Sequence, residues 1–154
     1  MNTMSLDTEK RLSEFIGKFK PAHRSLIRSV RKELRGRFPS AHELVYDNYN
    51  FFVIGYCTTE RPSDAFLSIA ASANGVGICF IHGASLPDPN GILQGSGKQT
   101  RFIHLETAAM LSRPEIGALL LVAAARARAP LPPKGRGKLV IRSVSAKQRP
   151  RQKS

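Results

Sequence analysis

The chain has 154 residues, of which 42% are hydrophobic and 23% are charged. This length and composition suit one folded domain and exclude both disorder throughout and a second independent core. No run approaches the ~20 apolar residues that span a bilayer, and acidic residues at positions 7, 9 and 14 do not fit a secretory signal, so we expect a cytoplasmic protein.

Charge is distributed unevenly along the chain. The 24 Lys and Arg residues against 11 Asp and Glu residues give a net charge of +13. All the acidic residues lie in 1–128, whereas 129–154 carries eight basic residues and no acidic one. This division predicts an α+β domain over 1–128 and a basic, partly disordered tail over 129–154. Such a charge attracts polyanions without identifying one.

Two helices are predicted at the N-terminus. Asp7 is a candidate N-cap for the first, whose apolar residues recur at helical spacing as far as Phe19. Pro21 suits the first position of the second helix, which we expect to end near Arg37. Four arginines of this helix share one narrow face, which predicts either a solvated surface or an anion-binding one: Arg24, Arg28, Arg31 and Arg35.

From His42 onward the apolar period changes to two, which predicts five short strands, the last within residues 100–106. Short connections favour an antiparallel meander. Asn74-Gly75 predicts a two-residue type I′ hairpin turn, because both residues tolerate positive φ angles. A longer loop with Gly95 and Gly97 precedes the fifth strand.

The C-terminal part is predicted to hold one helix and one further strand. Ser112 and Glu115 have the spacing of a capping box, and Pro130 would close the helix that they begin. After a Pro- and Gly-rich linker, residues 138–145 are apolar enough for an extra edge strand, and 147–154 has the composition of a disordered end. The expected fold class is therefore α+β, with two N-terminal helices, a five-stranded mainly antiparallel sheet and a C-terminal helix.

Two segments predict a site for a small anionic or polar ligand. The turn at 46–50 combines tyrosine hydroxyl and amide groups, although hydrogen bonding within the turn also accounts for it. The loop at 95–101 supplies cations beside flexible glycines. We expect the turn to recognise polar groups and the loop to neutralise an anion, with these residues: Tyr46, Asn48, Tyr49, Lys98, Arg101 and His104.

Signals for catalysis are weak, so a non-enzymatic protein without metal or cofactor is favoured. The segment Gly95-Ser96-Gly97-Lys98 lacks the spacing, the following Ser or Thr and the following helix of a phosphate loop. The four histidines do not have metal-ligand spacing. The two cysteines fit buried thiols, and a nucleophilic Cys79 would need an oriented base that the sequence does not indicate.

The alternative function is that of a nucleic-acid accessory protein. Its phosphate contacts would come from the arginine face and the tail, and no membrane partner is expected. Binding would depend steeply on salt and little on base, because the sequence does not interleave aromatic and basic residues. The residues of this predicted surface are Arg24, Arg28, Arg31, Arg35, Lys147, Arg149 and Arg151.

Three phrases resemble a subgroup of the YdhG-like family, a domain of unknown function: ELVYDNYNFFVIGY, LPDPNGILQGSGKQTRFIHLETAAMLSRPEI and KLVIRSVSAKQRPR. The resemblance spans residues 15–127, and the third phrase belongs to the subgroup's tail. It implies a compact α+β domain whose antiparallel sheet is covered by helices. One branch is described as frataxin-like, which implies an intracellular iron chaperone with clustered acidic residues. In this chain the corresponding helices carry the four arginines and the acidic residues are scattered, which does not favour iron binding. Iron carriage is therefore the third alternative, after ligand binding and nucleic-acid binding.

Overall fold

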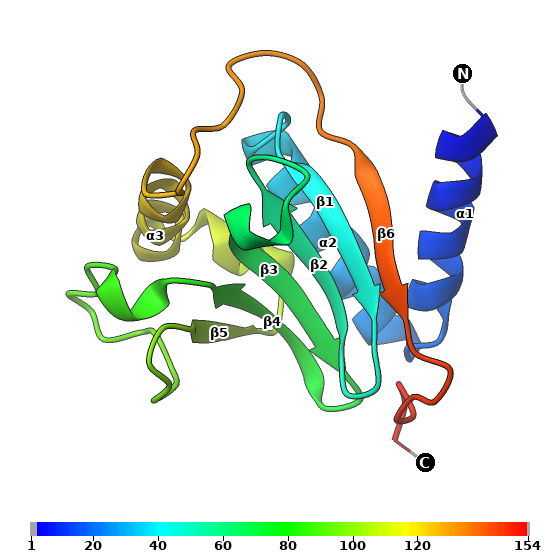
Figure 1. Ribbon diagram of the computed structural model, residues 1–154. Coiled ribbons are helices and arrows are strands. Elements are labelled where there is room, and N and C mark those ends of the chain that lie inside the picture. The colour runs from blue at the N-terminus through cyan, green and yellow to red at the C-terminus, as the bar shows by residue number, and fades with distance from the viewer. Residues whose placement is uncertain (1–2, 154) are drawn as a thin grey trace.

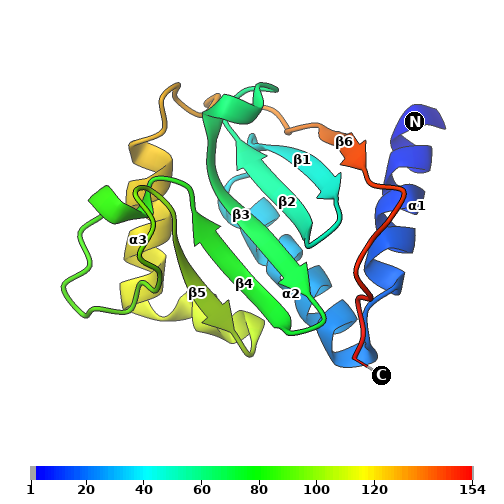
Figure 2. The same cartoon turned by 60° about the horizontal axis from the view of Figure 1, so that its bottom comes forward.

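The computed structural model describes residues 3–153 and has two layers. A six-stranded sheet forms one layer, and three α-helices cover one face of it (Figures 1 and 2). The core lies between the layers and consists almost entirely of aliphatic and aromatic side chains. The α+β class is confirmed. The expected five-stranded, mainly antiparallel sheet is wrong in detail, because the sheet has six strands and is mixed.

The N-terminal helices are α1 (Thr3–Gly17) and α2 (Pro21–Arg37). The predicted apolar stripes face the sheet. Phe15 of α1 and Phe19, which follows α1, pack against Phe52 with ring centroids 6.4 and 6.0 Å apart. Pro21 is the first residue of α2, as predicted. Asp7 is not an N-cap, because α1 begins four residues before it.

The five predicted strands form an antiparallel meander in which each strand pairs with the next. The expected topology of this part is therefore confirmed, and its order across the sheet follows the chain. The strands are β1 (His42–Asp47), β2 (Phe52–Cys57), β3 (Ala65–Ser72), β4 (Gly75–Phe80) and β5 (Arg101–Leu105).

The β3–β4 hairpin turns one residue earlier than predicted. Ser72 pairs with Gly75, so the two loop residues are Ala73 and Asn74. Among the described residues only glycines have positive φ, and Gly75 takes +145°. The predicted type I′ turn at Asn74-Gly75 is therefore wrong. A Cβ at Gly75 would also lie 2.5 Å from the ring of His104, so that side chain would have to move.

The sixth strand, β6 (Leu139–Val144), is the strand that the tail was expected to add. It pairs with β1 in parallel, because the chain crosses over from α3 and enters the sheet at the end where β1 begins (Figure 1). The amide of Gly137 donates to the carbonyl of Pro39, and that of Glu43 donates to the carbonyl of Lys138. This parallel crossover makes the sheet mixed.

The third helix, α3 (Pro114–Ala125), follows a short 3₁₀ turn (Ala108–Ser112). Ser112 is the last residue of that turn, so Arg113 takes the N-cap position and no side chain caps the helix. The predicted capping box is therefore wrong, although Pro114 does begin the helix. No helix within residues 3–153 is both long and apolar enough to cross a membrane.

Candidate functional site

The structure does not bring the turn at 46–50 and the loop at 95–101 together. Asp47 pairs with Phe52 at the end of the sheet where β5 finishes, and Val76 pairs with Leu105 at that same end. Arg101 begins β5 at the opposite end, where it pairs with Phe80. The two segments thus lie at opposite ends and toward opposite edges of the sheet, and no single ligand site forms between them.

The polar residues of the turn contact the tail. The hydroxyl of Ser143 donates to Oδ1 of Asn48 at 2.8 Å, and Tyr49 is exposed, with the guanidinium of Arg149 5.6 Å from its ring centre. Tyr46 is half-buried in β1. These contacts occupy part of the polar surface that the sequence assigned to a ligand.

The cations of the loop do not converge on one point. Lys98 is exposed, and the guanidinium of Arg101 donates to the loop carbonyls of Gly97 and Thr100. His104 lies on the open face of the sheet, opposite Gly77 of β4.

The predicted polyanion surface divides into separate parts. Arg151 is buried, with 2% of its side chain exposed, and donates to Asp47 at 2.8 Å. Arg24 donates to the carbonyl of Gly17. Lys147 and Arg149 are exposed on the tail. The other three predicted arginines, Arg28, Arg31 and Arg35, line a cationic groove beside α2.

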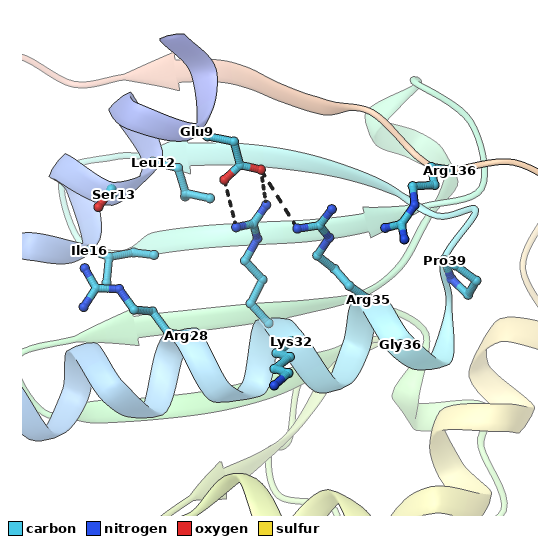
Figure 3. Close-up of a pocket in the computed structure, with 11 residues that line it drawn as sticks. Glu9, Leu12, Ser13, Ile16, Arg28, Lys32, Arg35, Gly36, Pro39 and Arg136 are labelled. Atoms are coloured by element: carbon cyan, nitrogen blue, oxygen red, sulfur yellow. Dashed lines mark hydrogen bonds and ion pairs between the residues drawn. The ribbon is translucent and has the colours of Figure 1, made fainter. Parts of the chain in front are cut away.

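This groove lies between α1 and α2 and is closed at one end by the segment that leads into β6 (Figure 3). It encloses about 770 Å³. Its walls combine a short apolar strip from α1 with cations from α2 and from the segment before β6. The charged lining residues are Glu9, Arg28, Arg31, Lys32, Arg35 and Arg136.

Arg31 is held in place by two carboxylates. Its Nη1 and Nη2 donate to Glu9 at 3.1 and 2.9 Å, and its Nε and Nη2 donate to Glu43 at 3.0 and 2.9 Å. Glu43 is buried and also accepts a hydrogen bond from the Tyr56 hydroxyl at 2.8 Å. Burial opposes the charge of Arg31, but these carboxylates raise its pKa, and its bidentate contact lowers the pKa of Glu9. Arg31 therefore stabilises the fold as well as the groove.

The other cations of the groove are free or weakly paired. Arg35 lies 4.0 Å from Glu9 and 3.8 Å from Glu43. Within residues 3–153, no hydrogen bond or ion pair is found for the side chains of Arg28, Lys32 and Arg136, and all three are exposed. An anion that contacts any of these three cations alone breaks no existing ion pair, whereas an anion that contacts Arg31 displaces Glu9.

Two of these three residues were not in the predicted polyanion surface. Lys32 follows Arg28 by four residues on α2, so helical spacing could have placed the two side by side. Arg136 had no local signal, because its segment reads as a linker and only the crossover to β6 brings it beside α2. Its place depends on a contact between segments about a hundred residues apart.

The thiols and acidic residues do not form a chemical site in the described structure. Cys57 is fully buried, and burial raises its pKa to about 12. Burial also raises the pKa of Cys79, which keeps its thiol protonated at neutral pH. Among residues 3–153 no group of three or more His, Cys, Asp or Glu side chains is placed to hold a metal ion.

Comparisons with protein-family models, with curated proteins and with solved structures were made for this chain. None gives a match. The resemblance to the YdhG-like family therefore stays a prediction from the sequence phrases, and the function is argued from the geometry alone.

Proposed function

We propose that the protein is a non-enzymatic binding module for a small, multiply charged anion, which binds in the groove between α1 and α2. The observation that carries this proposal is a set of three exposed cations that line the groove and have no ion-pair partner within residues 3–153: Arg28, Lys32 and Arg136. Ligands with several phosphoryl or carboxylate groups fit this arrangement, because charge-assisted hydrogen bonds to such groups are roughly twice as strong as neutral ones.

Glu9 limits the affinity of the groove. Its carboxylate accepts two hydrogen bonds from Arg31, which is the contact that an oxyanion of the ligand would make. The Glu9 side chain is 46% exposed, and exposed ion pairs contribute only about 0–1 kcal/mol. A ligand that contacts Arg31 therefore displaces Glu9 at small cost. Removing the Glu9 carboxylate should raise the affinity for the anion.

The test is calorimetric titration with inorganic pyrophosphate and tripolyphosphate. The triple variant Arg28→Ala, Lys32→Ala, Arg136→Ala should bind at least about tenfold more weakly than the natural chain, because each lost charge-assisted hydrogen bond contributes about 1.5–3 kcal/mol. Glu9→Gln should bind roughly three- to fivefold more tightly.

A matched control removes the same charge elsewhere. Lys98, Arg113 and Arg128 are exposed and lie outside the groove. Their triple alanine variant should keep nearly the affinity of the natural chain. An equal loss in both triple variants would show that the anion senses the net charge alone, and absence of binding by the natural chain and by Glu9→Gln would refute the proposal.

A further inference from the structure

The face of the sheet that the helices leave uncovered carries a trough of its own. It extends over β2, β3, β4 and β5 and has a volume of about 490 Å³. Its lining includes small residues such as Ala70 and Gly77, and a flat group can approach the sheet closely at these positions. The groove between α1 and α2 lies on the other side of the molecule, so this surface is separate from the proposed anion site.

Large aromatic side chains stand at both sides of the trough. Phe51 is 50% exposed, and Phe102 is 40% exposed. Residues that alternate with them along the strands, Phe52 and Ile103, are buried in the core. His104 adds a third ring to the same wall as Phe102. These rings offer stacking surfaces to a planar ligand.

Cations gather where the trough opens at the β3–β4 hairpin. A second hollow of about 450 Å³ shares Phe51 and Asn74 with the trough and is lined by Arg149 and Lys153 of the tail. The guanidinium of Arg149 also lies over the ring of Tyr49, which is 48% exposed. Folding thus interleaves aromatic and basic side chains that are about a hundred residues apart in the sequence.

We infer that this face binds single-stranded nucleic acid, whose bases stack on Phe51 and Phe102 while its phosphates contact Arg149 and Lys153. Proteins that bind single strands combine a cationic track with aromatic stacking surfaces, and a four-stranded sheet with exposed aromatics stacks two or three bases. A duplex does not fit, because its bases are already stacked and paired. A second copy of the chain is disfavoured by its net charge of +13.

The test uses fluorescence anisotropy with labelled oligothymidylate and oligouridylate, and a duplex of equal length for comparison. Phe51→Ala and Phe102→Ala should each weaken single-strand binding roughly five- to hundredfold. Leu121→Ala is the matched control, since Leu121 is an exposed apolar residue of α3, 65% accessible, and its loss should leave affinity unchanged. Similar affinity for both oligonucleotides indicates stacking alone. Preference for oligouridylate indicates recognition of the 2′-hydroxyl or exclusion of the thymine 5-methyl group, which are the two features by which the oligonucleotides differ.

Salt dependence tests the cationic contacts separately. In a plot of log Kd against log salt concentration, each neutralised phosphate of a single strand contributes about 0.7 to the slope. The double variant Arg149→Ala, Lys153→Ala removes two such contacts and should reduce the slope by about 1.4. The pair Arg113→Ala with Arg128→Ala removes the same charge from other exposed positions and should not change it.

A direct readout of stacking comes from Phe51→Trp, because the chain contains no tryptophan. Its fluorescence should be quenched as the oligonucleotide binds. The inference is overturned if the natural chain does not bind single strands, if the phenylalanine variants bind as tightly as the natural chain, or if gel filtration shows that these variants abolish a dimer instead.

Discussion

At the scale of single residues, the carboxylate of Asp47 joins side chains from two distant segments, the end of the N-terminal helix region and the tail. It is fully buried, accepts a hydrogen bond from Lys18 at 2.8 Å and another from Arg151 at 2.8 Å. Burial raises the pKa of Asp47, but the hydrogen bonds from Lys18, Arg151 and Gln148 together hold the pKa below its ordinary value. The charged form is therefore the one that stabilises the native state.

Replacing this carboxylate should be strongly destabilising. Asp47→Asn leaves the buried guanidinium of Arg151 without its counter-ion, and removal of one partner of a buried ion pair costs about 3–5 kcal/mol. Urea denaturation should show this loss at pH 7. Asp7→Asn is the control, since Asp7 is exposed and such surface changes stay within about 0.5 kcal/mol.

The same variant should change the response to acid. Because the folded-state pKa of Asp47 is lowered, its stabilising contribution is complete above the ordinary value of 3.8 and is lost as the pH falls below it through the folded-state pKa. As the pH falls below 3.8, the natural chain should therefore lose more stability than the Asp47→Asn variant. Parallel stability curves for the two proteins would contradict this account of Asp47.

At the scale of elements, the segment after α3 is part of the domain. β6 extends the sheet beside β1, and the amides of Ser145 and Arg149 donate to the carbonyls of Asp47 and Tyr49, both at 2.9 Å. Arg151 then enters the buried site beside Asp47. Of the basic side chains in the tail, Arg151 anchors the tail to the domain, whereas others such as Lys147 and Arg149 remain exposed.

Truncation separates these contributions. A chain that ends at Ser145 keeps β6 but lacks Arg151, so thermal unfolding should show a loss of about 3–5 kcal/mol. A chain that ends at Arg128 also lacks β6 and should be much less stable. The control Lys147→Ala with Arg149→Ala removes tail charge but keeps the anchor and should unfold near the natural midpoint. Equal midpoints for the full chain and the chain ending at Ser145 would show that Arg151 does not anchor the tail.

At the scale of the whole molecule, the two layers give two separate surfaces. The groove is formed by the helices, whereas the aromatic trough is formed by the opposite face of the sheet. Electrostatic interactions between exposed charges are screened beyond about 8 Å at physiological ionic strength. The two proposed ligands should therefore bind independently.

This independence is testable with the variants already described. The triple variant of the groove should keep its oligothymidylate affinity within about twofold at physiological ionic strength, and Phe51→Ala with Phe102→Ala should keep pyrophosphate binding unchanged. A large effect of the groove variant on oligonucleotide binding would place the nucleic acid on the helices instead, as the arginine face of α2 first indicated.

Local patterns were sufficient to predict most elements of the fold. The apolar stripe of α2 and the alternation of the strands each reflect burial of one face, which a short stretch of sequence records directly. Predictions that depended on individual caps and turns were wrong at Asp7, Ser112 and Asn74. Cap and turn positions depend on the path of the neighbouring chain, and a shift of one to four residues leaves the apolar pattern unchanged.

The sequence by itself determined the α+β class, the order of the helices and strands, and the strong excess of basic charge, because these follow from periodicity and composition. Only the tertiary structure decided how the charges are used. It buried Arg151 beside Asp47, placed Arg136 beside α2, and separated the turn at 46–50 from the loop at 95–101. The physical reason is that ion pairs and ligand sites form between residues distant along the chain, and strand register and crossovers set those distances.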